Sequence, residues 1–277
     1  MHWVVLPLAC AVLTGCANLS GDSTAGRSPE ADLQPFALRL LSTPASEPAW
    51  EVFALPGKRS APFEASTVMG RPALRVRADR SVSILRQRFA NPAVNVGQLD
   101  FSWKIDSLPI GADMRDAQTE DSPVRVVLAF GGDRSRLSPR AHRLSELSRL
   151  ITGEELPFAT LSYVWSAHEP LETVILNPRT DRIRKLVVAS GPTQLGQWLD
   201  YRRDVRADFV RAFGEEPGPL LAIALMTDTD NTESALQAWY GALHLRPASN
   251  AAADAPAVPA MPSPAGKISS PNTGHPG

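Results

Sequence analysis

A cluster of oxygen-bearing side chains directly follows an apolar segment near the end of the chain. Leu220–Met226 is apolar throughout, and Asp228, Asp230 and Asn231 come within the next few positions. Carboxylate and amide oxygens are the ligands that Ca²⁺ prefers, so the cluster is a candidate calcium site. It is not an EF-hand, because counting from Asp228 the sixth residue is Glu instead of Gly and the twelfth is Trp instead of Glu. The alternative is a turn in which these side chains bond nearby backbone amides.

Three aromatic side chains supply flat surfaces on which a sugar ring could stack. Tyr163 and Trp165 lie two positions apart in the strand-like segment Thr160–Trp165, so both belong to one face of that strand. Trp198 follows a loop that contains Gly and Pro. Large aromatic residues also form the cores of β-sandwiches. We therefore expect Tyr163, Trp165 and Trp198 to bind glycan, with a position in the core as the alternative.

Paired carboxylates could hydrolyse or cleave a glycan if the fold held two of them about 5 to 10 Å apart. The candidates are Glu120-Asp121, Asp204, Asp208, Asp228 and Asp230. Asp204 and Asp208 are four residues apart and would share one helix face, but arginines surround them, which favours a solvated ion-pair face. The sequence alone selects no pair from this set.

Several kinds of chemistry lose their usual sequence signals. The chain has no HExxH, GxSxG, Walker or GxGxxG motif, and His142, His168 and His244 lie in contexts that share no pattern. The 28 basic and 29 acidic side chains give a net charge of −1, so no excess of positive charge favours nucleic acid. We expect neither a nucleotide enzyme nor a nucleic-acid-binding protein.

The N-terminus carries an apolar run, Trp3–Leu13, that leads into Leu13-Thr14-Gly15-Cys16. The run is too short to span a bilayer but fits a signal peptide, although no Lys or Arg precedes it. The last four residues resemble the lipobox of bacterial lipoprotein precursors. The resemblance implies removal of residues 1–15 and lipid attachment to Cys16, which would anchor the protein to a membrane. Ala17, in place of the Asp that retains lipoproteins in the inner membrane, favours the outer membrane, facing the periplasm.

Processing at this site would leave no free thiol in the mature chain, because Cys10 and Cys16 are the only cysteines. Disulfides, thiolate nucleophiles and cysteine-ligated zinc are then excluded. Composition divides the rest of the chain: we expect a polar tether at residues 16–34, one domain at residues 35–246, and a disordered tail rich in Pro and Ala at residues 247–277.

Alternation of apolar and polar residues dominates the expected domain. Gln98–Ile105 and Ala73–Ala78 alternate with period two, whereas Val124–Phe130 and Leu220–Met226 are apolar on both faces. Further strands are expected at Thr160–Trp165, Thr173–Leu176, Ile183–Ala189 and Gln237–Leu245. Many short strands with few helices predict a mainly β fold, a two-sheet antiparallel sandwich of jelly-roll type.

Two helices are expected within this sandwich. Leu137–Ile151 has an apolar stripe that we expect to dock on a sheet, with contact to lipid headgroups as the alternative, and Gly153 ends it. Asp204–Phe213 forms the second helix, ended by Gly214.

Six blocks of the sequence, taken in order, resemble the bacterial family of unknown function DUF3047. They are Thr160–Trp165, Asn177-Pro178, Ser190–Trp198, Asp204–Gly214, Met226–Thr232 and Ala238–Gly241. The resemblance covers about residues 50 to 246. Glu120-Asp121 and Arg125 stand where the family tends to show an Asp-Asp pair, an arginine and an aromatic-bearing strand. This member would therefore bind any ligand of that segment differently. The resemblance implies no activity.

Together these observations predict an outer-membrane lipoprotein whose β-sandwich binds glycan without cleaving it. Asp228, Asp230 and Asn231 would hold a calcium ion, and no other cofactor is expected. A glycan hydrolase or lyase that uses paired carboxylates is one alternative, and a scaffold for another envelope protein is a second. The sequence leaves the oligomeric state open.

Overall fold

The computed structural model describes residues 50–89 and 96–247. The predictions for the signal peptide, for Cys16, for the tether and for nearly all of the tail lie outside these residues. Among the described helices, none combines the length and the apolar character needed to cross a bilayer.

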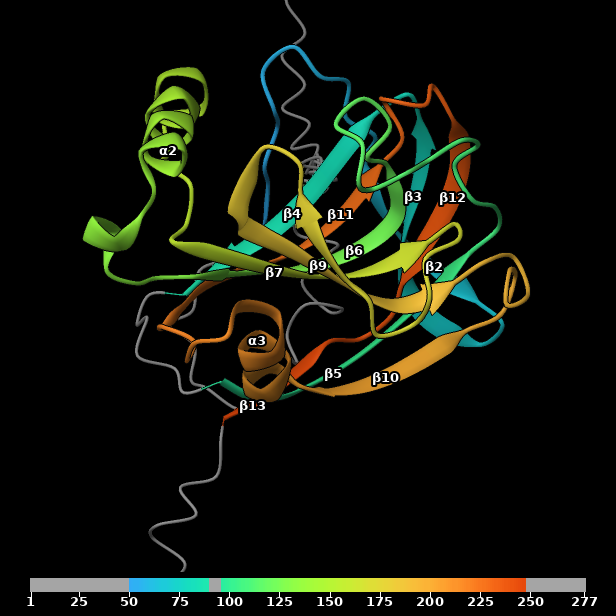
Figure 1. Cartoon of the computed structure of the whole chain (residues 1–277). Coiled ribbons are helices and arrows are strands. Elements are labelled where there is room, and N and C mark those ends of the chain that lie inside the picture. Colours follow the sequence, from blue (N-terminus) through green and yellow to red (C-terminus); the bar gives the residue numbers. More distant parts are fainter. Residues whose placement is uncertain (1–49, 90–95, 248–277) are drawn as a thin grey trace, which may run out of the picture.

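The described residues form two β-sheets packed face to face (Figure 1). The larger sheet has seven strands in the order β1-β4-β11-β6-β7-β9-β8. These strands are β1 Glu51–Val52, β4 Val82–Arg88, β6 Ser122–Phe130, β7 Ala159–Ser166, β8 Val174–Asn177, β9 Thr180–Ser190 and β11 Leu220–Asp228. The fold is the mainly β sandwich that the sequence predicts.

The smaller sheet has six strands within the described part of the chain. Its order is β10-β5-β12-β3-β2, and β13 pairs with the same strand β5 beyond the end of β12. The strands are β2 Phe63–Val68, β3 Arg71–Asp79, β5 Val96–Ile105, β10 Leu199–Asp204, β12 Ala235–Tyr240 and β13 His244–Pro247. The last expected strand, Gln237–Leu245, is therefore two strands separated by a short detour of the backbone.

One pair of strands departs from the antiparallel pattern. β7 and β9 run parallel, because the chain leaves β7, first forms the edge strand β8, and then returns as β9 between the two. β1, β2, β4 and β10 were not expected from the sequence. β10 alternates half-buried and exposed residues along its whole length, and the run Leu199–Asp204 has only two large apolar side chains to mark it as a strand.

The core fills the space between the sheets, and the alternation in β5 shows how it forms. Leu99, Phe101, Trp103 and Ile105 point inward and are buried, whereas the residues between them face outward. Phe101 stacks on Tyr163 of the opposite sheet with ring centroids 5.4 Å apart. β7 is buried on both faces, so Thr160, Ser162 and Ser166 are buried along with its apolar residues.

Helix α2, Pro139–Thr152, begins after the N-cap Ser138 and ends at Gly153, which has a left-handed backbone as the C-cap (Figure 1). The apolar stripe docks only at its start. Leu137, just before the helix, and Ala141 are buried, but Leu147 and Ile151 are 50% and 53% exposed. The prediction that the whole stripe docks on a sheet is wrong, because the helix stands away from the sandwich after its first turns.

Helix α3, Val205–Phe213, packs against strands of both sheets and ends at Gly214. Phe209 anchors it in the core, 4.7 Å from Phe130 between ring centroids. Asp204 lies outside the helix as its N-cap, and its carboxylate accepts a hydrogen bond from the backbone amide of Ala207 at 2.9 Å. The expectation that Asp204 and Asp208 share a solvated helix face is therefore wrong.

Candidate functional site

Two of the three aromatic residues singled out in the sequence are part of the core. Tyr163 and Trp165 are both 0% exposed on the inward face of β7. The Tyr163 hydroxyl donates to Asp208 Oδ2 at 2.8 Å, and the Trp165 indole donates to the carbonyl of Gly191 at 3.1 Å. Neither ring is open to a sugar in this structure.

The Tyr163 hydroxyl belongs to a buried charged network. Arg203 donates from Nη2 to Asp208 Oδ1 at 2.7 Å and from Nε to Oδ2 at 2.9 Å, and it also binds Glu172. Burial, and then the charge of Asp208, raises the pKa of Tyr163 well above its ordinary value. Asp208 thus joins α3 to the sheets through Tyr163 and Arg203, and these contacts have a structural role.

Trp198 lies at the outer surface of the smaller sheet, directly before β10. Its indole nitrogen donates to the carbonyl of Val68 at 3.2 Å, so the ring is held at the end of the β2–β3 hairpin. The guanidinium of Arg71 lies 5.6 Å from the ring centroid, and Arg71 Nη1 pairs with Asp200 Oδ1 at 2.8 Å. The ring is half-buried and keeps an exposed part.

An open groove of about 420 Å³, which we call the Trp198 groove, lies next to this ring, although the ring itself is not among the residues that line it. It is lined by Asp100, Phe101, Ser102, Asp200, Tyr201, Arg202, Ala242 and His244. The strand register places Asp200 opposite Ser102 and Arg202 opposite Asp100, so these polar side chains share the outer face of β5 and β10. The detour between β12 and β13 brings His244 to the same groove.

Gly241 connects the groove to the indole of Trp198. A Cβ at this position would clash with Ser102 Oγ and would lie 3.5 Å from the Trp198 ring. The missing side chain therefore lets the indole and the groove-lining hydroxyl approach each other. The backbone amide of Gly241 donates to the carbonyl of Ser102 at 2.9 Å, which fixes the detour against β5.

The carboxylates of the groove are paired with arginines. Asp100 accepts from Arg202 Nε at 2.7 Å and from Arg246 Nη2 at 2.8 Å. The hydrogen bond from Arg202 lowers the pKa of Asp100, so this group is ionised at neutral pH. The groove therefore offers fixed negative acceptors beside arginine donors.

The acidic cluster predicted from the sequence forms at the other sheet with one change of member. Asp121, Asp228 and Asp230 each bring one carboxylate oxygen within 4.8 Å of the others. Asn231 instead donates its side-chain amide to the carbonyls of Gln118 and Ala117 at 3.1 and 3.4 Å. Asp121 is the residue that sequence reasoning left out of this set, because it comes from the distant β5–β6 loop and was considered only as half of the Glu120-Asp121 pair.

Asp228 is buried, at 5% exposed, as is Asp121 at 2%. Its Oδ2 accepts from Arg125 at 2.9 Å, whereas its Oδ1 is buried and has no hydrogen-bond partner among the described residues. Burial raises the pKa of Asp228 to about 8 against the effect of Arg125. Asp230 pairs with Lys58 at the rim.

The alternative prediction for this segment was a turn held by hydrogen bonds from side chains to the backbone, and part of the β11–β12 connection is such a turn. Asp121 Oδ2 accepts from the backbone amide of Thr232 at 2.7 Å and from its hydroxyl at 2.6 Å. The backbone amide of Asn231 donates to Asp121 Oδ1 at 3.3 Å. Asp121 therefore holds the β11–β12 turn in place whether or not an ion is bound.

A buried lysine, Lys185, lies close to Arg125 and Asp228. Lys185 is 1% exposed, and its Nζ donates to the carbonyl of Met114 at 3.0 Å and to Glu120 Oε2 at 3.4 Å. Burial, and then the positive charge of Arg125, lowers the pKa of Lys185 to about 8. Charged groups of both signs are thus buried beneath the β5–β6 loop.

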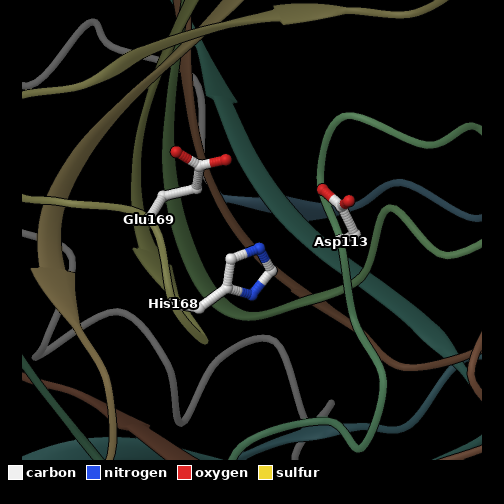
Figure 2. Close-up of side chains that lie close together, drawn as sticks. All are labelled: Asp113, His168 and Glu169. Carbon is white, nitrogen blue, oxygen red and sulfur yellow. The ribbon is translucent and has the colours of Figure 1, made fainter.

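A second group of potential metal ligands joins two loops (Figure 2). Asp113 comes from the β5–β6 loop, and His168 and Glu169 from the segment after β7. One ligand atom of each lies within 4.8 Å of the others, with the imidazole between the two carboxylates in this view. No sequence motif indicated this group, since two distant segments supply it.

A larger and mostly apolar groove of about 500 Å³ lies on the outer face of the seven-stranded sheet. Small side chains form its floor, among them Ala129, Ala222 and Ala224, and Phe53 and Phe158 line its sides. Arg86 lies over the Phe53 ring at 4.1 Å and binds both oxygens of Glu154. Arg88, Arg134 and Glu155 also line this groove, but most of its surface is apolar, which suits the hydroxyl groups of a sugar less well than the Trp198 groove does.

The sequence profile of the DUF3047 family, proteins of unknown function, matches residues 48–244. The chain belongs to the DUF3047 family. The matched region contains the Trp198 groove and both carboxylate groups, so all of them are parts of the DUF3047 domain. No curated protein matches the sequence.

Several solved structures resemble this DUF3047 domain at low identity. The xyloglucanase domain of NopAA, a type three effector from Sinorhizobium fredii, in complex with cellobiose, has 8% identity and a TM-score of 0.38, with 72% of this chain and 97% of that chain covered. Endoglucanase 3 of Trichoderma harzianum, from family GH12, has 8% identity and a TM-score of 0.39, with 72% and 90% covered. A mutant of the family 29 carbohydrate-binding module CBM29-2 has 10% identity and a TM-score of 0.27, with 71% and 85% covered.

Proposed function

We propose that this DUF3047 domain binds a glycan, without cleaving it, in the Trp198 groove. The observation that supports the proposal is the joint presence of two carboxylates, a hydroxyl and an imidazole in one open hollow beside a partly exposed indole. A sugar presents hydroxyl groups that donate and accept hydrogen bonds, together with apolar C–H faces. The groove supplies partners for both kinds of surface.

The pairing of the groove side chains suits recognition of hydroxyl groups. Asp100 and Asp200 are held by arginines and keep free lone pairs for sugar hydroxyls. Arg71 is exposed and can move away from the indole, which would free part of the ring for an apolar sugar face. A carboxylate that is already oriented loses little freedom when a ligand binds.

The same pairing argues against hydrolysis at this groove. A glycosidase needs one carboxyl group that is protonated near neutral pH, so the pKa of its acid is raised. The pKa of Asp100 is lowered instead, and Asp200 pairs with Arg71. Asp228 has a raised pKa, but it is buried and does not line the groove. The glycan hydrolase or lyase remains the less favoured alternative.

Retention on insoluble glycan tests this proposal. The protein is incubated with peptidoglycan and with exopolysaccharides, and the bound fraction is measured for wild type and for Trp198→Ala, Asp200→Asn and Ser102→Ala. Asp181→Asn is the matched control, because Asp181 is exposed and lies outside the groove. Retention by wild type and by the control, with loss in the groove variants, supports the proposal. Equal retention by all variants contradicts it.

A measurement of released products separates binding from catalysis. We expect no new reducing ends and no soluble fragments after long incubation with the glycans that the protein retains. Release that disappears in Asp228→Asn or Asp121→Asn would favour the hydrolase or lyase over the binding module.

We also propose that a calcium ion binds at Asp121, Asp228 and Asp230, with Asp121 as the third ligand instead of the Asn231 expected from the sequence. Three carboxylates lie close together, and the buried Oδ1 of Asp228 lacks a hydrogen-bond partner among the described residues. A hard cation that accepts six to eight oxygen ligands would satisfy this atom.

The location in the cell is a separate proposal. We propose that Cys16 carries lipid and anchors the protein to the outer membrane, facing the periplasm; the order Leu13-Thr14-Gly15-Cys16 supports this. Labelled palmitate should enter the wild-type chain and not Cys16→Ser. Equal labelling of both chains, or none of either, contradicts the anchor without affecting the glycan proposal.

A further inference from the structure

The β5–β6 loop and the β7–β8 connection meet through three side chains with metal-binding atoms. One carboxylate oxygen of Asp113, one imidazole nitrogen of His168 and one carboxylate oxygen of Glu169 lie within 4.8 Å of one another. Figure 2 shows the imidazole of His168 between the two carboxylates. Neither nitrogen of this imidazole has a hydrogen-bond partner in the described part of the chain, although two acceptors are near. The ring is therefore close to both carboxylates but bonded to neither.

We propose that Asp113, His168 and Glu169 bind a divalent transition-metal ion of the Zn²⁺ class. One imidazole nitrogen and two carboxylate oxygens suit Zn²⁺, whereas Ca²⁺ and Mg²⁺ prefer oxygen ligands alone. In a tetrahedral zinc site with bonds of about 2.0–2.2 Å, neighbouring donor atoms are roughly 3.4 Å apart. The three side chains would need to approach by up to about 1.4 Å from their present separation of up to 4.8 Å. Three protein ligands leave a fourth position for water or for another ligand.

Both carboxylates are already held in place by the same arginine. The backbone amide of Arg115 donates to Asp113 Oδ1 at 2.8 Å. Its side chain donates from Nε to Glu169 Oε1 at 2.5 Å and from Nη2 to Oε2 at 3.1 Å. Each oxygen keeps a second lone pair, so these hydrogen bonds orient the ligands without using all their acceptor capacity. Hydrogen bonds of this kind to ligating carboxylates are typical of metal sites.

The backbone on both sides of the site is fixed as well. Ser166 Oγ accepts from the backbone amide of Glu169 at 3.0 Å, and Ser190 Oγ donates to the Glu169 carbonyl at 2.5 Å. On the other loop, the backbone amide of Asp113 donates to the carbonyl of Thr119 at 2.9 Å. The ligands thus come from ordered segments, which reduces the entropy lost when an ion binds.

A bound ion would join the β5–β6 loop to the segment that follows β7. Next to Asp113, Met114 covers a small apolar cluster with Val164, Ile175 and Val187 on the outer face of the larger sheet. Glu120 of the same loop contacts Lys185, and Asp121 contacts Thr232 in the β11–β12 turn. The ion would therefore stabilise the cover of this sheet face and would not contact the Trp198 groove, so the inference is independent of the proposed glycan binding.

Calorimetric titration tests the site directly. The full chain is purified in detergent without a histidine tag, treated with a chelator, and titrated separately with Zn²⁺, Ca²⁺ and Mg²⁺. We expect Zn²⁺ binding that His168→Ala removes and that Asp113→Asn or Glu169→Gln weakens at least tenfold. His142→Ala on α2 is the matched control and should bind as wild type does. His168 is exposed, so its replacement should leave the circular dichroism spectrum unchanged.

Thermal unfolding provides a second reading that does not depend on heat of binding. At an excess of Zn²⁺ of about a hundredfold over Kd, the Tm of wild type and of His142→Ala should rise by about 5 °C, and that of His168→Ala should not. The proposal is overturned if wild type binds no Zn²⁺, if His168→Ala binds Zn²⁺ as tightly as wild type, or if Ca²⁺ binds to these three residues more tightly than Zn²⁺.

Discussion

Arg125 and Asp228 form an ion pair between neighbouring strands of the larger sheet. Arg125 Nη2 lies 2.9 Å from Asp228 Oδ2, and the two side chains are 7% and 8% exposed. Arg125 also donates to the backbone carbonyl of Glu120 at 2.5 Å, so one guanidinium connects β6, β11 and the β5–β6 loop. The pair is buried, and its loss has a larger effect than the loss of a surface pair.

Above about pH 8, where Asp228 is ionised, Arg125→Met should lower the free energy of unfolding by about 3–5 kcal/mol, because it leaves this carboxylate buried without its cation. Arg125→Met combined with Asp228→Leu should recover a large part of this loss. Arg206→Met is the control, since the Arg206–Glu216 pair is about 60% exposed on both sides and should contribute less than about 1 kcal/mol. Urea unfolding measures wild type, these three variants and the single variant Asp228→Leu. Additive effects of the two buried substitutions would contradict the coupling.

Calcium should raise the Tm of wild type if Asp121, Asp228 and Asp230 bind it, because an ion that binds only the folded state stabilises that state. Asp230→Asn should remove most of the shift, because it removes one of the three carboxylates. We choose this residue because it lies at the rim, where its replacement should disturb packing least. Asp181→Asn should keep the shift. Differential scanning calorimetry with and without millimolar calcium gives the measurement, and an equal shift in Asp230→Asn would exclude this residue as a ligand.

The strands of this fold could be predicted where local sequence determines them. β5 alternates between the two faces, and β6 and β11 are apolar over most of their length, so each was expected. The parallel pairing of β7 with β9 could not be predicted, because it depends on β8 lying at the edge of the sheet, so that β9 lies between β8 and β7. The period of a strand gives its faces but not its neighbours.

The site residues were harder to predict for a related reason. The spacing of Tyr163 and Trp165 places both on one face of β7, but nothing in the spacing tells whether that face points to the core. It does, and Phe101 of β5 stacks on Tyr163 there. The Trp198 groove joins β5, β10 and the detour before β13, so its members are far apart in the sequence and only the register brings Asp200 opposite Ser102.

Lys185 should make stability depend on pH above neutrality. Its pKa in the folded state is about 8, below the ordinary 10.5, so between these values the unfolded chain binds the proton and the folded chain does not. The free energy of unfolding therefore rises as pH increases from about 8 towards 10.5, by on the order of 3 kcal/mol for this group, and the gain is lost as pH falls through about 8.

Lys185→Met removes this titration, so the difference in unfolding free energy between wild type and variant should change over that pH interval. Chemical denaturation at about pH 7, 9 and 10 measures the difference. A difference that stays constant would mean that Lys185 has the same pKa in both states.

Tyr163→Phe separates a structural role from a role in binding. The substitution removes the hydrogen bond from the tyrosine hydroxyl to Asp208 Oδ2 and leaves Arg203 as the partner of that carboxylate. We expect a loss of about 2 kcal/mol in the free energy of unfolding, since the acceptor is charged and buried, and unchanged retention on glycan. Trp198→Ala should show the opposite pattern, with retention lost and stability changed little. Retention that falls in Tyr163→Phe while its unfolding free energy stays at the wild-type value would place the ligand near β7 instead of in the Trp198 groove.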